Sequence, residues 1–146
     1  MVNPRPFAEF NADFPDDIVE DADGNIVIYP GQNVAEAIGE MLRKAGCVVT
    51  PPLHEAHRGW SFEAVAKDRT IWLLVSDLGG QHILQTEERG SFWRKLFGAR
   101  DTIYADVMTG LNDALAKDAR FKNVLWFPKD WDASGVKGVR NPMGDD

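Results

Sequence analysis

The segment from residue 59 to residue 88 constrains the fold of this chain more than any other. It reads GWSFEAVAKDRTIWLLVSDLGGQHILQTEE, three strand-like runs of alternating or apolar residues separated by two short turn signals. The paired glycines Gly79 and Gly80 supply the positive φ angles that a two-residue hairpin turn requires. The segment therefore predicts a three-stranded meander at the centre of a mostly antiparallel sheet.

The positions of the turns predict which residues face one another. A first turn at Asp68-Arg69 places Ala64 opposite Leu73, and the second turn is Gly79-Gly80. Because side chains alternate along a strand, this register separates two faces. The face assigned to the core is apolar: Phe62, Ala64, Ala66, Ile71, Leu73, Val75 and Leu84. The other face is mixed: Ser61, Glu63, Val65, Lys67, Trp72, Leu74, Ser76, Ile83, Gln85 and Glu87.

Two long amphipathic helices are expected, at about 34–45 and 102–117. Asn33 has the chemistry of an N-cap for the first helix, and Gly46 suits the position after its end. Asp101 fits the cap of the second helix. Apolar stripes on both helices need a surface to cover, so we expect both helices to pack on one face of the sheet. The predicted fold class is α+β.

The rest of the chain gives shorter signals. Residues 1–16 form an acidic and aromatic segment in which Phe7, Phe10 and Phe14 have the spacing of one face of a short helix. Further predictions are a small hairpin across residues 17–29, a short strand at 47–50 and a last strand at 123–127. The predicted organisation is a single domain over residues 1–128, followed by a loop or partly disordered tail over 129–146.

Charge and cysteine content narrow the classes of function. The formal net charge is −7, and residues 1–23 carry seven acids against one arginine, which argues against nucleic-acid binding. No apolar run is long enough to span a bilayer, and no signal peptide is recognisable at the N-terminus. The single cysteine, Cys47, fits a reducing compartment. We therefore expect a cytoplasmic protein that binds neither nucleic acid nor membrane.

The mixed sheet face is the first candidate site. Trp72 and Leu74 lie near its middle, and an exposed tryptophan on a sheet is usually covered by something. The aromatic face of the N-terminal segment is one possible cover. The alternative is a protein partner that docks on this face and on the aromatic-basic segment after it. The predicted partner-binding residues are Trp72, Leu74, Glu63, Glu87, Phe92, Trp93 and Arg94.

A second hypothesis is a small hydrolase-like or metal-dependent enzyme that uses His54, His57, His82 and Asp77. Asp77 faces His82 across the second turn in the predicted register, where a carboxylate can hold the tautomer of an imidazole. Ser76 points to the opposite face, which opposes a Ser-His-Asp triad. His54 and His57 stand three residues apart in an expected loop, not at the i, i+4 spacing of zinc-protease helices. No catalytic, metal or cofactor residue is assigned.

Tyr29 to Asn33, just before the first helix, offers backbone N–H groups that suit an anion, but it lacks the spacing of a phosphate or dinucleotide loop. The favoured function is therefore a non-catalytic protein-binding module, comparable to the small acidic α+β immunity and accessory proteins of bacteria. Its partner is an unknown protein, and a homodimer is an open alternative.

Overall fold

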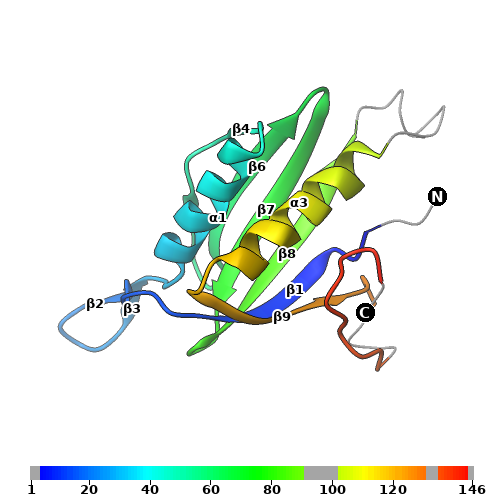
Figure 1. Cartoon of the computed structure of the whole chain (residues 1–146). Helices are drawn as coiled ribbons and strands as arrows, with labels where there is room; N and C mark the ends of the chain where they lie inside the picture. The colour runs from blue at the N-terminus through cyan, green and yellow to red at the C-terminus, as the bar shows by residue number, and fades with distance from the viewer. Residues whose placement is uncertain (1–3, 91–101, 131–134, 145–146) are drawn as a thin grey trace.

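The structure is a computed structural model that describes residues 4–90, 102–130 and 135–144. Within these residues it holds a seven-stranded antiparallel sheet, a separate two-stranded sheet and two helices. The strands are β1 (Phe7–Ala12), β2 (Val19–Glu20), β3 (Ile26–Ile28), β4 (Val48–Val49), β5 (Leu53–Glu55), β6 (Gly59–Ala66), β7 (Arg69–Asp77), β8 (Gln81–Arg89) and β9 (Phe121–Phe127). The helices are α1 (Gln32–Lys44) and α3 (Ile103–Lys117). Both lie on the same face of the large sheet (Figure 1), and the predicted α+β class is confirmed.

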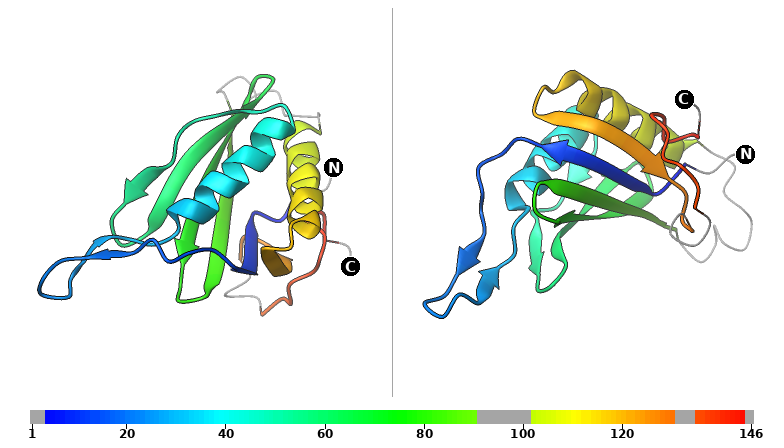
Figure 2. Two further views of the ribbon diagram at one scale, coloured as in Figure 1. Left: turned by 60° about the vertical axis from the view of Figure 1, so that its left-hand side comes forward. Right: turned by 90° about the horizontal axis from the view of Figure 1, so that it is seen from below.

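The large sheet extends well beyond residues 59–88. Its strand order is β4-β6-β7-β8-β1-β9, and β5 also pairs with β6. β1 therefore lies between β8 and β9, so the first and the last strand of the chain are neighbours in one sheet (Figure 2). On the opposite border, β4 and β5 are short strands separated by Pro51 and Pro52, and each pairs with a different part of β6. The three strands of residues 59–88, β6, β7 and β8, are neighbours within this seven-stranded sheet.

The register is as predicted for one hairpin and wrong for the other. Val75 lies opposite Leu84, with the β7–β8 turn at Gly79-Gly80, both at positive φ. In the β6–β7 hairpin, however, Ala64 lies opposite Ile71, because the turn falls at Lys67-Asp68 with Lys67 at φ 55°. The error is two residues. Since side chains alternate with a period of two, the predicted faces survive the shift.

The predicted N-terminal helix is wrong, because residues 7–12 form β1. The strand pairs with β8 on one side and with β9 on the other. This pairing stabilises the extended conformation more than the helical spacing of the phenylalanines can stabilise a helix. Its side chains alternate accordingly: Ala8 and Phe10 are buried under the helices, whereas Phe7 lies on the opposite face beside Gln85. Phe14 follows the strand and packs edge-on against Phe121 at 5.4 Å.

Helix α1 begins earlier than expected and is capped by a distant residue. Gly31, at φ 116°, holds the N-cap position, so the predicted Asn33 cap is wrong. The carboxylate of Asp17 instead accepts hydrogen bonds from the backbone N–H groups of Gly31 and Asn33, at 2.9 and 2.8 Å. The anion suited to these N–H groups is therefore supplied by the chain itself. At the other end, Gly46 adopts φ 99°, as predicted, and Asp101 lies outside the described residues.

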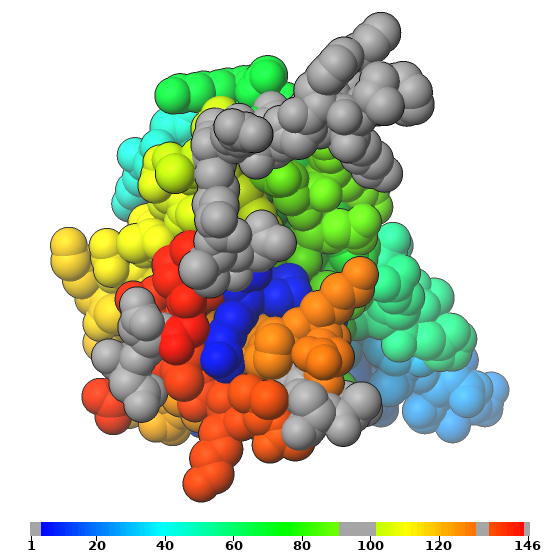
Figure 3. Space-filling model, turned by 90° about the vertical axis from the view of Figure 1, so that its right-hand side faces the viewer, coloured from blue at the N-terminus to red at the C-terminus, as the bar shows by residue number. Residues whose placement is uncertain are grey.

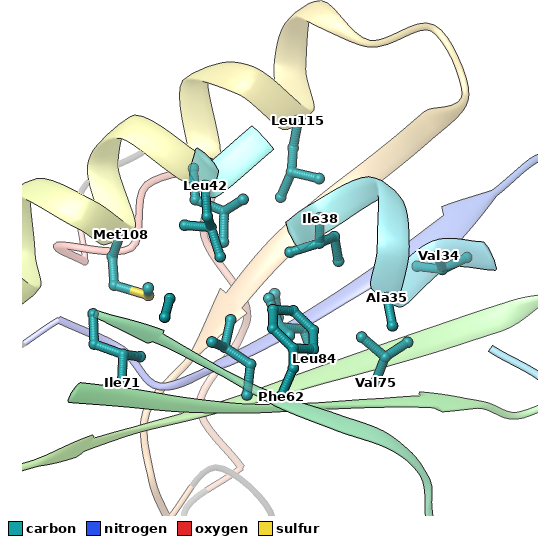
Figure 4. Close-up of a cluster of buried hydrophobic side chains, with 14 of the residues drawn as sticks. Val34, Ala35, Ile38, Leu42, Phe62, Ile71, Val75, Leu84, Met108 and Leu115 are labelled. Atoms are coloured by element: carbon teal, nitrogen blue, oxygen red, sulfur yellow. The ribbon is translucent and has the colours of Figure 1, made fainter. Parts of the chain in front are cut away.

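The core lies between the two helices and the sheet. Side chains from α1, such as Ile38 and Leu42, and from α3, such as Met108 and Leu115, point toward the strands (Figure 4). They meet the apolar face predicted from the sequence, which includes Phe62, Ile71 and Leu84, all almost fully buried. The predicted core face is therefore confirmed.

Two further segments complete the described fold. The β2–β3 hairpin projects from one end of the molecule (Figures 1 and 2) and confirms the small hairpin expected at residues 17–29. Val139 forms a two-way backbone bridge with Trp126 of β9, and the carbonyl of Pro142 accepts a hydrogen bond from the N–H of Arg5. Residues near both termini and β9 consequently share one side of the molecule (Figure 3). Among the described residues, no helix has the length and apolar character needed to cross a membrane.

Candidate functional site

The face of the large sheet that points away from α1 and α3 carries the predicted binding residues, and no described helix lies against it (Figure 2). We call it the open face. The residues that define it share the same side of the pleat: Phe7, Glu9, Glu63, Val65, Trp72, Leu74, Ile83, Gln85 and Glu87. Four of the seven predicted binding residues therefore share one surface. Phe92, Trp93 and Arg94 lie outside the described residues.

Pairing between the strands places these side chains in two adjacent rows. Trp72 lies between Glu63 on β6 and Glu87 on β8. In the next row, Leu74 lies between Ser61 and Gln85. Facing residues in an antiparallel sheet are within side-chain contact distance, so the half-buried Trp72 has a carboxylate on each side, whereas Leu74 in the next row is only 5% exposed.

Two arginines lie over the ring of Trp72. The guanidinium carbon of Arg58 is 5.6 Å from the ring centroid, and that of Arg89 is 5.3 Å away. Both distances suit cation–π attraction. Arg58 belongs to the turn between β5 and β6, whereas Arg89 ends β8, and both side chains are exposed. The spacing of residues along the chain did not indicate this arrangement, because it depends on how three strands pair.

The predicted cover for Trp72 is absent from the described residues. Phe10 lies on the helix-covered face, where its ring stacks on His82 with 5.5 Å between centroids. Phe14 packs on Phe121, and Phe7 becomes part of the open face itself. A strand cannot lay all three phenylalanines on one surface, because its side chains alternate.

Asp77 and His82 form a close pair, as their facing positions predicted. Nε2 of His82 is 3.4 Å from Oδ2 of Asp77. The other carboxylate oxygen of Asp77 accepts a hydrogen bond from the N–H of Gly79 at 2.9 Å. Ser76 points away, as expected, and its hydroxyl donates to the backbone carbonyl of Arg58 at 2.6 Å.

The other two histidines lie against Tyr29, a residue that the sequence analysis did not select. Nε2 of His54 accepts a hydrogen bond from the backbone N–H of Tyr29 at 2.9 Å. Nδ1 of His57 is 2.6 Å from the phenol oxygen of Tyr29, and Trp60 donates its indole N–H to the carbonyl of Tyr29 at 2.8 Å. The predicted loop at His54 is wrong, since this residue belongs to β5 and is half-buried.

The four residues of the enzyme hypothesis thus divide into two pairs with different partners. A hollow of about 330 Å³ is lined by both His57 and Asp77. Nevertheless, among the residues that the structure describes, no three His, Cys, Asp or Glu side chains are grouped so that they could hold a metal ion. The geometry offers one carboxylate–imidazole pair and two histidines engaged in structural hydrogen bonds.

A larger hollow, of about 550 Å³, opens where β1, the end of β8 and the start of α3 meet. Tyr104 lies here with its hydroxyl 2.7 Å from that of Thr86, which in turn donates to the carbonyl of Pro6. Burial raises the pKa of the Tyr104 phenol. Burial also raises the pKa of Glu88, although Arg69 lies 3.3 Å from its carboxylate. Both residues are on the helix-covered side, and their polar groups already contact Thr86 and Arg69.

Cys47 has no sign of nucleophilic activation. It is almost fully buried after the end of α1, and burial raises the pKa of its thiol.

Comparisons with known proteins found no matching protein-family model, no matching curated protein and no matching solved structure.

Proposed function

We propose that this protein is a non-catalytic protein-binding module of the immunity or accessory type and that the open face is its binding surface. The observation that carries the proposal is the position of Trp72. It stands at the centre of a sheet face without a described helix and is held between Arg58 and Arg89. Tryptophan and arginine are the residues most enriched at the energetic centres of protein interfaces.

The charges around the tryptophan indicate the chemistry of the partner. Glu63 and Glu87 flank Trp72 in the same row, and Glu9 lies opposite Ile83 nearer to the other border of the face. These carboxylates favour a partner that presents lysines or arginines around an apolar centre. The net charge of −7 would accelerate association with such a partner. Self-association through this face would bring like charges together, so a homodimer is not favoured.

A non-catalytic role is supported by the state of the histidines. His54 and His57 are already bonded to Tyr29, and His82 is almost fully buried. His57 is exposed, but its Nδ1 is engaged by the phenol of Tyr29, and the imidazole that has a carboxylate neighbour, His82, is the buried one. The single, buried Cys47 is consistent with the reducing cytoplasm, which is the location we propose.

The direct test is photo-cross-linking in the native host. A photoreactive phenylalanine analogue is placed at Ile83, on the open face, and in a second protein at Ala116, an exposed position on α3. We expect a discrete adduct with a basic protein from position 83 and not from position 116. No adduct from position 83, or an adduct with a second copy of the chain, would contradict the proposal.

Variants in the cross-linking background test the role of the aromatic centre. Trp72→Ala should abolish the adduct while the protein still melts cooperatively. Val27→Ser is the matched control, because Val27 is an exposed apolar residue on the β2–β3 hairpin and should leave the adduct intact. A double Glu63→Lys and Glu87→Lys variant should weaken binding by reversing the charges that face a basic partner. Retention of the adduct in Trp72→Ala would refute the proposed surface.

A further inference from the structure

A separate cavity of about 520 Å³ lies between the base of the β2–β3 hairpin, the start of α1 and the β7–β8 turn. We call it the arm pocket. Its walls include apolar and aromatic side chains, among them Phe14, Ile18, Tyr29 and Val34, and its lining also contains Asp77 and His82. It therefore combines an apolar wall with a small number of polar groups, as small-molecule sites do.

The charge of the arm pocket has one sign. Three aspartates line it, Asp16, Asp17 and Asp77, and no lysine or arginine does. The chain around it is equally one-sided, because residues 6–42 contain nine acidic residues and no lysine or arginine. Such a site attracts cations and repels carboxylates and phosphates.

His82 provides an independent sign of a missing partner. The residue is 4% exposed, and its Nδ1 is buried without a hydrogen-bond partner among the described residues. The carboxylate of Asp77 near Nε2 favours the tautomer with its proton on that nitrogen, which leaves a lone pair on Nδ1. A buried acceptor without a donor is costly, so a ligand that brings an N–H group would remove that cost.

We propose that the arm pocket binds a cationic N–H donor, a guanidinium or an ammonium group, carried on a short apolar stem. Asp77 pairs with the positive charge, and His82 accepts a hydrogen bond from the same group. Tyr29 contributes an aromatic wall that favours a cation, while Ile18 and Val34 pack against the stem. Both a free alkyl amine and the side chain of a partner's arginine or lysine have this chemistry.

This site is independent of the proposed function. Asp77 and His82 belong to the helix-covered side of the sheet, whereas Trp72 and Leu74 belong to the open face. A small cation can therefore be tested without a protein partner. If the arm pocket binds no cation, the open-face proposal is unaffected. If the open face binds no protein partner, the arm-pocket proposal is unaffected.

The test is an NMR titration of ¹⁵N-labelled protein with n-butylguanidinium chloride. We expect saturable shifts of the amide resonances of Tyr29, Asp77, Gly80 and His82. Neutral n-butylurea and anionic valerate, which keep the same stem, should produce no saturable shifts at these positions. Equal binding of n-butylurea, or shifts only at other positions, would overturn the proposal.

Two variants locate the interaction. Asp77→Asn should weaken n-butylguanidinium binding by about 10- to 100-fold, the range expected for loss of a charge-assisted hydrogen bond. His82→Phe, which keeps a ring against Phe10 but removes the acceptor, should weaken it by about tenfold. Asp113→Asn, at an exposed position on α3, is the matched control and should bind as the wild type does.

Amide spectra and melting curves of each variant show whether it is folded. If Asp77→Asn disrupts the β7–β8 turn, Asp16→Asn at the same pocket replaces it, with an expected weakening of several-fold. Wild-type affinity in folded Asp77→Asn and His82→Phe variants would refute the site.

A second titration with acetyl-Gly-Arg-Gly-amide separates the two sources of the cation. Tighter binding of the peptide than of n-butylguanidinium assigns the pocket to a partner's arginine, and weaker binding assigns it to a free small-molecule cation.

Discussion

The two faces of the large sheet use neighbouring residues of the same strand for different purposes. Leu73 is completely buried against the helices, whereas Trp72, one residue earlier, faces the other way between two arginines. On the helix-covered face, burial of apolar area supplies stability. On the open face, two exposed arginine side chains lie over Trp72, and the proposed partner would displace them. The difference implies that stability and binding can be changed separately by substitutions one position apart.

The largest expected effect is on the helix-covered face. Leu73→Ala removes a completely buried side chain between two neighbouring strands and the helices, and should lower the free energy of unfolding by about 2–5 kcal/mol. Urea denaturation followed by circular dichroism measures the loss. A cost below that of Trp72→Ala would show that the helix-covered face does not hold the hydrophobic core.

A smaller loss is expected on the open face. Trp72→Ala should cost about 1–2 kcal/mol, since it removes two cation–π contacts at an accessible site. The same denaturation experiment applies, and the transition should remain cooperative. A loss as large as that of Leu73→Ala would mean that Trp72 is a core residue and would remove the contrast between the faces.

A half-buried hydroxyl tests whether polar groups beside the helices also contribute to stability. Tyr104→Phe deletes the hydrogen bond to Thr86, at 2.7 Å, and should cost about 1 kcal/mol. Because burial raises the pKa of Tyr104, its phenol should also ionise above the usual range in an ultraviolet pH titration of the folded protein. Ionisation in the range of an exposed tyrosine would contradict the burial of this side chain.

The smallest expected effect compares two adjacent carboxylates on opposite faces of β8. Burial raises the pKa of Glu88, so the folded state favours its protonated form. The resulting stabilisation is complete below the unfolded pKa, near 4.5, and is lost as the pH rises through the higher folded value. Glu88→Gln should therefore gain stability relative to the wild type between about pH 4 and 7.

The gain should be below about 1 kcal/mol because of solvent screening. Glu87→Gln, which removes the carboxylate on the open face, is the matched control. Both variants are compared with the wild type by chemical denaturation at about pH 4 and about pH 7. An equal or larger pH-dependent gain in Glu87→Gln would contradict the assignment of the two side chains to different environments.

The parts of the fold that could be predicted from sequence are those encoded by local periodicity. The apolar stripes of both helices and the alternation in residues 59–88 indicated elements and faces correctly. A period of two made the face assignment insensitive to the two-residue register error at Lys67. By contrast, β1 was predicted as a helix, because its conformation depends on β8 and β9, far along the chain.

The candidate sites were predictable to a smaller extent. The predicted register brought Asp77 and His82 together and placed Glu87 opposite Trp72, but on the other side of Trp72 it put Val65, where the structure has Glu63. The arginines over Trp72, the cap that Asp17 provides for α1 and the contacts of both other histidines with Tyr29 all join distant segments. No spacing along a single segment encodes such contacts, so they require the folded structure.

The borders of the sheet limit how any other chain can approach it. On one side, Pro51 and Pro52 interrupt the border between β4 and β5, and proline lacks the N–H that a continuous backbone ladder needs. On the other side, Val139 already occupies backbone groups of Trp126 on β9. Lateral addition of a strand, the route by which sheets polymerise, is therefore obstructed at both borders of the described sheet. The binding proposed for the open face therefore relies on side chains, and so on the particular sequence, and not on the pairing of backbone groups.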